Sequence, residues 1–159
     1  MREIVLDTET TGLDPADGHR IVEIAALELV NFLPTGRHYH VYLNPQRDMP
    51  EEAERVHGLS SQFLADKPLF KDSVAAFTDF IADAPLVIHN AKFDMKFLDA
   101  ELALIKRPKL ANSIIDTLAM AKKKHPRQRV NLDALCRMYN ISLENRTLHG
   151  ALIDCELLA

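Results

Sequence analysis

The stretch REIVLDTETTGL, residues 2–13, opens with an apolar run and then places two carboxylates one residue apart. We predict a buried strand over residues 2–7, which ends at Asp7. Side chains alternate along an extended chain, so Asp7 and Glu9 point to the same face. Two neighbouring anions in a poorly solvated place repel each other and raise each other's pKa. The pair therefore needs either solvent beyond the strand end or a cation.

Further strands and helices follow from the hydrophobic periodicity and the turn residues. Three early strands joined by short loops predict an antiparallel meander, and the later segments alternate strand with helix. The sequence therefore predicts an α/β fold with a mixed five-stranded sheet, three antiparallel strands and then parallel strands, flanked by helices, in one domain over residues 1–159. The predicted strands are residues 2–7, 21–29, 37–43, 86–89 and 113–115, and the predicted helices are residues 51–56, 60–65, 70–82, 92–105, 117–124, 131–139 and 150–158.

The composition is that of a globular protein, with 47% hydrophobic and 26% charged residues in a chain of 159. No apolar stretch approaches the ~20 residues of a membrane span, and the N-terminus lacks a signal-peptide pattern. Cys136 and Cys155 form no CxxC pair, so we interpret them as reduced core residues of a cytoplasmic protein. The net charge of −4 argues against a strongly basic nucleic-acid binder.

Asp94 lies in the first turn of the helix that follows the strand near residues 86–89. Asn90 is the expected N-cap, and the helix dipole favours a negative group at this position. Capping electrostatics alone is therefore a sufficient explanation of Asp94. The stripe predicted on this helix runs through Phe93, Phe97, Ala100 and Leu104.

Asp154 is harder to explain by local structure. Ala151, Cys155 and Leu158 form an apolar stripe on the last helix, and Asp154 falls on the edge of this stripe. A carboxylate among apolar residues on a packed face needs a partner. A metal ion can serve several such anions at once.

Carboxylates in all-oxygen ligation suit a hard divalent ion, Mg²⁺ or Mn²⁺, rather than zinc. Asp7, Glu9, Asp94 and Asp154 could hold two such ions ~3.5–4 Å apart, the arrangement used for phosphoryl hydrolysis. This chemistry also needs a general base near the attacking water.

His149 is the candidate base, although a histidine of no catalytic role is the simpler interpretation of any single loop residue. It precedes Asp154 by five residues, which on one continuous helix would turn the two side chains about 140° apart. We therefore expect His149 in the loop before the helix, with Gly150 giving the turn its freedom.

These residues together resemble a known family. Asp7-x-Glu9 in DTETTG, Asp94 in HNAKFD and His149-x4-Asp154 in HGALID are similar to the motifs of the DEDDh group of DnaQ-like 3′–5′ exonucleases. Within this group, the chain resembles the proofreading branch that serves bacterial replicative DNA polymerases. The likeness runs along essentially all 159 residues, and the motifs are specific as an ordered set.

The resemblance implies a ribonuclease-H-like fold and two-metal removal of nucleotides from a 3′ end. Asp7 would bridge both ions, Glu9, Asp94 and Asp154 would complete their ligation, and His149 would be the general base. The segment EEAERVHGLS, residues 51–60, is similar to the family's contact region for the terminal nucleotide. The implied substrate contacts are Asp7, Thr8, Glu9, Thr10, Glu52, His57 and Asp154.

The resemblance also implies partners: a single-stranded DNA 3′ end, a polymerase catalytic subunit and a small accessory subunit of the replicase core. Setting aside the four metal-site carboxylates leaves 19 acids against 19 Lys and Arg, so the rest of the chain is neutral. We therefore expect weak intrinsic affinity for DNA and a partner that delivers the substrate. The chain ends in mid-helix at CELLA, which suggests that a C-terminal polymerase-binding tail is missing.

Three other features have simpler explanations. Asp116 precedes a helix and is expected to be its N-cap, and His38 and His40, on one face of a strand, are expected to be exposed. Lys122, Lys123 and Lys124 could guide a single strand, but a solvated surface explains them equally well.

Two rival functions also remain at this stage. One is a DEDDh exoribonuclease acting on RNA 3′ ends, and the other is a non-catalytic metal-binding module of a polymerase assembly.

Overall fold

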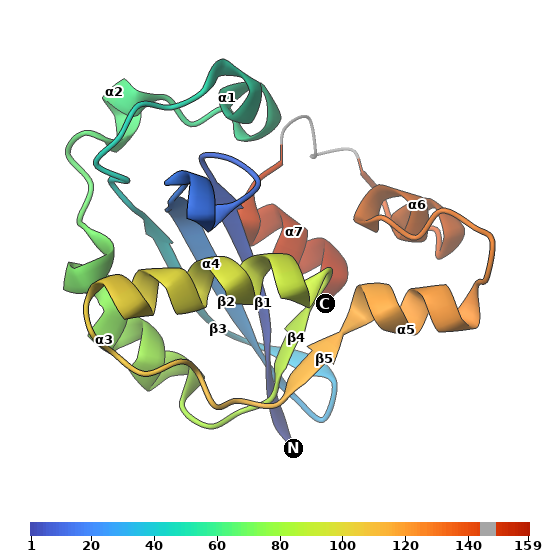
Figure 1. Ribbon diagram of the computed structural model, residues 1–159. Coiled ribbons are helices and arrows are strands. Elements are labelled where there is room, and N and C mark those ends of the chain that lie inside the picture. Colours follow the sequence, from blue (N-terminus) through green and yellow to red (C-terminus); the bar gives the residue numbers. More distant parts are fainter. Residues whose placement is uncertain (144–148) are drawn as a thin grey trace.

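The computed structural model describes residues 1–143 and 149–159 and contains a five-stranded sheet with the strand order β3-β2-β1-β4-β5 (Figure 1). The first three strands pair antiparallel, and β4 and β5 run parallel to β1. The mixed sheet expected from the sequence is therefore confirmed. The strands are β1 (Arg2–Thr10), β2 (Ile21–Val30), β3 (Leu33–Tyr42), β4 (Leu86–Ile88) and β5 (Ile114–Asp116).

Helices cover both faces of this sheet, with α3 and α4 on one face and α7 on the other (Figure 1). Within the described residues, no helix is both long enough and apolar enough to cross a membrane. The helices are η1 (Pro15–Asp17), α1 (Glu51–His57), α2 (Ser61–Leu64), α3 (Phe70–Ile81), α4 (Ala91–Leu104), α5 (Thr117–Lys124), α6 (Leu132–Met138) and α7 (Ala151–Leu158).

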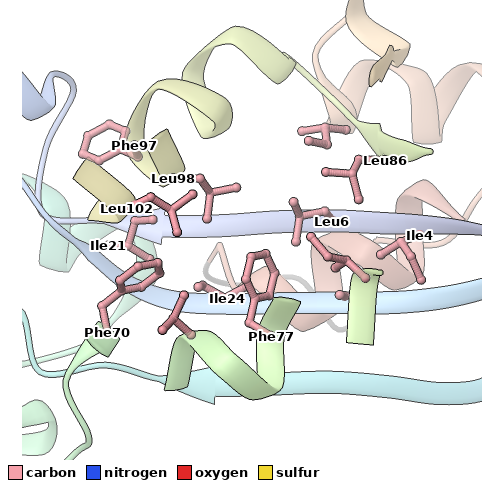
Figure 2. Packing of buried hydrophobic residues seen from close by; sticks show 14 of the residues in the cluster. Ile4, Leu6, Ile21, Ile24, Phe70, Phe77, Leu86, Phe97, Leu98 and Leu102 are labelled. Atoms are coloured by element: carbon pink, nitrogen blue, oxygen red, sulfur yellow. The ribbon is translucent and has the colours of Figure 1, made fainter. Parts of the chain in front are cut away.

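The main core lies between the sheet and helices α3 and α4, as Figure 2 shows. Ile4 and Leu6 face this core from β1, where they meet Phe77 of α3 and Phe97 of α4. Val5, between them in the strand, packs instead against α7 in a second cluster. This alternation places Asp7 and Glu9 on the α7 face, because they follow Val5 with the period of two.

Strand β1 extends through Thr10, beyond the residues 2–7 predicted from the sequence. Its pairing with β2 continues past the two acids, and the register shifts only between Glu9 and Thr10. Asp7 and Glu9 therefore lie within a paired strand rather than beyond its end. Strand β3 also begins earlier than predicted, because Asn31 and Phe32 adopt positive φ angles of 50° and 68° and close a tight two-residue hairpin.

The buried face of α4 differs from the predicted stripe. Phe97 is buried as expected, but Leu104 is 65% exposed. Asp94 and Glu101, seven residues apart and hence on one side of the helix, are buried instead. The stripe was wrong because a hydrophobic pattern counts carboxylates as outward-facing, whereas both of these have partners inside the protein.

Parallel pairing brings the carboxyl ends of β1, β4 and β5 to the same edge of the sheet. The loops and helices after these strands therefore begin beside one another, which is where open α/β sheets commonly bind ligands. Asp94 follows β4 and Asp116 ends β5 at this edge, close to the last residues of β1.

Candidate metal centre

Strand β1 presents the first two carboxylates of the site toward α7. Burial of Asp7, and then repulsion from Asp94, Glu9 and Asp154, raises the pKa of Asp7 well above its usual range. The Oδ2 atom of Asp7 is buried and has no hydrogen-bond partner among the described residues. A buried carboxylate oxygen without a donor, surrounded by other carboxylates, fits a cation.

Asp94 is held by the residue between the two β1 carboxylates. Its Oδ1 atom accepts hydrogen bonds from the backbone N–H of Thr8 at 3.1 Å and from Thr8 Oγ1 at 2.6 Å. Burial raises the pKa of Asp94 to about 7, although both bonds to Thr8 lower it. Asn90 occupies the N-cap position as expected, but with φ of 67° and with no side-chain cap bond.

Asp154 and His149 come from α7 and the segment before it. His149 lies ahead of the helix, as predicted, and its backbone N–H donates to Val56 O of α1 at 2.8 Å. Asp154 is 8% exposed, on the edge of the apolar stripe as predicted. The conformational role predicted for Gly150 is wrong, because its φ of −139° is extended backbone open to any residue.

One group in the described part of the chain is arranged to hold a metal ion: Glu9, His149 and Asp154 offer ligand atoms that all lie within 4.8 Å of one another. Asp7 adjoins this group, since Glu9 and Asp154 both help to raise its pKa, and Asp94 raises the pKa of Asp7 as well. Three elements far apart in the sequence thus place four carboxylates and one imidazole together. Oxygen-rich sites of this kind favour Mg²⁺ or Mn²⁺.

A pocket of about 560 Å³ adjoins the carboxylates on the side of α1. Its lining includes four of the predicted substrate contacts: Glu9, Thr10, Glu52 and His57. Thr8 is not in this lining, because its side chain points to Asp94. The volume is within the roughly 300–1,000 Å³ of small-molecule sites. Apolar walls come from Leu13, Ala53, Val56 and Phe93.

His57 is a buried part of the pocket wall. Its Nδ1 atom accepts the N–H of Leu59 at 3.0 Å, so the ring proton lies on Nε2, which donates to Thr10 O at 3.1 Å. Burial lowers the pKa of His57. Both ring nitrogens are thus occupied by the protein where His57 lines the pocket.

Glu23 and His40 lie beside the site and were not recognised from the sequence. Glu23 is 3% exposed on β2, and its Oε2 atom lies 2.6 Å from His40 Nε2. The expectation that His40 is exposed was therefore wrong, because this contact half-buries its ring. Glu23, one of two glutamates inside the otherwise apolar run of residues 21–29, was the signal that could have identified the pair.

Two expectations about other residues are confirmed. Asp116 caps α5 and accepts the N–H groups of Leu118 and Ala119. Cys136 and Cys155 are free and buried.

Comparisons of the whole chain with known proteins agree with this geometry. The sequence model of the family described as Exonuclease (RNase_T) matches residues 4–159. DNA polymerase III subunit epsilon of Rickettsia prowazekii (strain Madrid E) is 56% identical over 163 residues, which cover 100% of this chain and 71% of the relative. The subunit of the same name from Escherichia coli (strain K12) is 49% identical over 166 residues, which cover 99% of this chain and 68% of the relative.

Solved structures show the same fold. Exonuclease X in complex with 5′ overhanging duplex DNA superposes with a TM-score of 0.77 at 25% identity and covers 97% of this chain and 84% of its own. The nuclease domain of 3′hExo, a DEDDh family member bound to rAMP, gives a TM-score of 0.85 at 16% identity, over 99% of this chain and 87% of its own. At the lower identity the likeness concerns the fold alone.

Proposed function

The chain belongs to the Exonuclease family (RNase_T), and we propose that it removes nucleotides from the 3′ ends of single-stranded or mispaired DNA, as the proofreading nuclease of a DNA replicase. Identities of 49–57% to epsilon subunits of DNA polymerase III along the whole chain support this choice within the family. The resemblance to DnaQ-like exonucleases inferred from the motifs is thereby confirmed.

One observation carries the proposal: four carboxylates and His149 meet beside a pocket of nucleotide size. When bound by Asp7, Glu9, Asp94 and Asp154, two divalent cations, Mg²⁺ or Mn²⁺, supply charge stabilisation for hydrolysis of a phosphodiester. The Oδ2 atom of Asp7 is buried without a hydrogen-bond donor from the described residues, and the clustered carboxylates repel one another, so cation binding is favourable even without substrate.

His149 is proposed as the general base that takes the proton from the attacking water. It is exposed, so the proton can pass on to solvent, and it stands within 4.8 Å of ligand atoms of Glu9 and Asp154. The bond from its backbone N–H to Val56 O fixes the main chain at this residue. Proton transfer by a positioned side chain typically contributes ~10²–10⁴-fold to a rate.

The pocket beside α1 is proposed to hold the 3′-terminal nucleotide. Leu13, Val56 and Phe93 offer apolar surface for a base, and the exposed carboxylate of Glu52 offers an acceptor for a sugar hydroxyl. His57 lines the same pocket, and the backbone around Thr8 and Thr10 lies beside the sugar. The scissile phosphate would then face Asp7, Glu9 and Asp154.

Substrate delivery by a partner follows from the same charges. The chain outside the metal site carries as many acids as bases, so it provides little general attraction for DNA. We propose a polymerase catalytic subunit as the partner that presents the frayed 3′ end, with a small accessory subunit in the same core. This function, and the reduced cysteines, predict a cytoplasmic location.

The test is mononucleotide release from 3′-tailed DNA and from RNA of matched sequence, each with Mg²⁺, Mn²⁺ or chelator. We expect metal-dependent release from DNA and its loss, by a factor of about 10² or more, in His149→Ala. His38→Ala, which removes an exposed histidine of β3, is the matched control and should keep full activity.

The outcomes separate the rival functions. Preference for RNA would move the function to an exoribonuclease. Metal binding without hydrolysis of either polymer would support a non-catalytic module. Full activity of His149→Ala would overturn the assignment of the base and leave the rest of the proposal in place.

A further inference from the structure

The start of α7 determines where two residues of the proposed site stand. A helix leaves its first N–H groups without partners inside the helix, and these groups need acceptors from elsewhere. Gly150 is the N-cap and has no side chain to provide one; the N–H of Asp154 is bonded to Gly150 O at 2.9 Å. The N–H of Ala151 donates instead to Glu23 Oε1, at 2.9 Å.

Glu23 reaches this helix from the neighbouring strand. It is the cross-strand partner of Glu9, so both carboxylates lie on the sheet face that α7 covers. Its Oε2 atom is 2.6 Å from Nε2 of His40 on β3. Both oxygens of Glu23 thus have donors within the protein, and the carboxylate is committed to the helix and the imidazole rather than to a metal ion.

The segment ahead of α7 is therefore held from two directions. Val56 O of α1 accepts the backbone N–H of His149, and Glu23 Oε1 accepts the N–H of Ala151, two residues further along the chain. His149 precedes this anchor by two residues, and Asp154 follows it by three. A shift of the anchor would move both side chains relative to Glu9.

We propose that Glu23 and His40 are positioning residues of the nuclease site. The pair fixes the first turn of α7 and thereby sets the distance of His149 and Asp154 from Glu9. Partners that orient metal ligands in this way typically affect metal affinity or activity by about 10- to 100-fold. The inference rests on the proposed function, since it assigns the pair a part in that reaction.

The experiment compares two substitutions at each position of the pair. Glu23→Ala removes both acceptors, whereas Glu23→Gln keeps an oxygen for the N–H of Ala151. His40→Leu removes the donor to Glu23, whereas His40→Gln keeps one. Glu28→Ala and Glu28→Gln are the matched controls. Glu28 is a glutamate of the same strand, is 5% exposed, and forms ion pairs with Arg2 and Arg37 away from the site.

Three quantities are measured well below each variant's melting temperature: the kcat of mononucleotide release, its KM, and the affinity for Mn²⁺ alone. We expect Glu23→Ala to lower kcat or Mn²⁺ affinity by about 10- to 100-fold with little change in KM. His40→Leu should show a similar loss of kcat or Mn²⁺ affinity. Glu23→Gln and His40→Gln should keep most of the wild-type values. The effects of Glu23→Ala and His40→Leu should fall short of additive when combined, because both act through one contact.

The Glu28 variants separate positioning from general stability. They should lower the melting temperature and leave kcat and Mn²⁺ affinity unchanged. A Glu23→Ala variant that folds with wild-type kcat and Mn²⁺ affinity would overturn the inference, and so would equal losses in Glu23→Ala and Glu28→Ala. An inactive wild type would instead count against the proposed function, and Mn²⁺ affinity would still test the positioning of Asp154.

Discussion

Thr8 shows how a residue that is not itself a proposed metal ligand can influence the protonation of a carboxylate that is one. It sits between Asp7 and Glu9 in the strand, on the opposite face, and both of its donors go to Asp94 Oδ1. These bonds favour the charged form of Asp94, the form that binds a cation, while burial favours the neutral one. The threonine thus partly offsets the burial that raises the pKa of Asp94.

Thr8→Val should weaken metal binding near neutral pH. It removes the hydroxyl bond and keeps the backbone one, so the pKa of Asp94 rises further, by about one unit for a hydrogen bond to a charged group. The midpoint of Mn²⁺ binding against pH should move upward by a similar amount. Thr78→Val, which removes a hydroxyl bonded to helix carbonyls of α3, is the control, and an unmoved midpoint in Thr8→Val would contradict the account.

The metal-free protein should lose stability as the pH rises toward and past neutrality. The pKa of Asp94 is raised from an ordinary 3.8 to about 7 in the folded state. Its contribution is therefore fully present below pH 4 and is lost as the pH rises through about 7. The pKa of Asp7 is raised as well, so its contribution has the same sign.

The measurement is the free energy of unfolding in chelator between pH 5 and pH 8. Burial lowers the pKa of His57 and His89, which gives the opposite slope below pH 6.5, so the informative quantity is the difference between wild type and Asp94→Asn. The wild type should lose stability relative to Asp94→Asn as the pH rises. Asp79→Asn, an exposed change on α3, should follow the wild type.

At this scale the sequence predicted the residues whose spacing is distinctive. Asp7, Glu9, Asp94, His149 and Asp154 stand out in the sequence as an ordered set, and the structure brings them together. Residues that act through backbone contacts left weaker signals. Thr8 lies just beyond the predicted strand of residues 2–7 and Glu23 lies within that of residues 21–29, and neither position indicates the partner that the folded chain supplies.

Among the elements, the loop after β1 depends on one close approach. A Cβ on Gly12 would lie 2.4 Å from three ring atoms of His19, whose Nδ1 is 2.9 Å from Thr11 Oγ1. The loop and the ring pack together and form part of the pocket wall. Only glycine permits this packing.

Gly12→Ala should raise KM several-fold and leave Mn²⁺ affinity near that of the wild type. The added methyl group displaces His19 or the loop, and both border the pocket rather than the carboxylates. Gly150→Ala is the matched substitution, since a Cβ there meets nothing within 4 Å. Equal KM changes in the two variants would contradict the steric explanation.

Helix α4 is tied to the start of β2 by a buried ion pair. Glu101 accepts Arg20 Nε at 2.6 Å and Arg20 Nη2 at 2.8 Å, and Glu101 Oε1 also takes the N–H of Ile21 at 3.3 Å. The Glu101 side chain is 3% exposed and that of Arg20 is 26% exposed. This contact holds the helix that carries Asp94 against the sheet.

Glu101→Ala should lower the free energy of unfolding by about 2–3 kcal/mol, because it leaves Arg20 and a buried N–H without their acceptor. Lys96, also on α4, forms an exposed ion pair with Asp14, which lies in the loop after β1. Lys96→Ala removes this pair and should lower the free energy of unfolding by less than about 1 kcal/mol. Chemical denaturation in chelator measures both. Equal losses of unfolding free energy in Glu101→Ala and Lys96→Ala would mean that burial does not strengthen the contact between Glu101 and Arg20.

Periodicity predicted nearly all of the elements, and it failed where pairing or charge overrides local pattern. β1 runs on through Asp7 and Glu9 because β2 supplies partners there. The inward face of α4 includes Glu101, which no apolar pattern can reveal. Both errors arise from contacts between segments distant in the sequence.

Across the whole molecule, the carboxylates come from the first strand, a central helix and the last helix. Their repulsion acts between elements that the fold holds together by apolar packing and by contacts such as Thr8 to Asp94 and Ala151 to Glu23. The order of strands and helices predicted this fold class, and the ordered motifs predicted which ends meet. A cation bound by these carboxylates would consequently link β1 to α4 and α7.

Binding of Mn²⁺ should therefore raise the melting temperature of the whole domain. A ligand at about 100 times its Kd adds about 2.7 kcal/mol, which for this size corresponds to a rise of roughly 5–10 °C. The rise should be larger at pH 8 than at pH 6, because Asp94, with a pKa of about 7, must lose its proton to bind the ion. Scanning calorimetry with and without Mn²⁺ at both pH values provides the measurement.

Asp154→Asn should abolish most of this rise, whereas Asp79→Asn should keep it, because only the former removes a carboxylate that faces Glu9. The change at Asp154 also severs α7 from the ion, so β1 and α7 are no longer joined through the site. An undiminished rise in Asp154→Asn would mean that Mn²⁺ binds through β1 and α4 alone. The last helix and the segment before it would then contribute to the site only through His149.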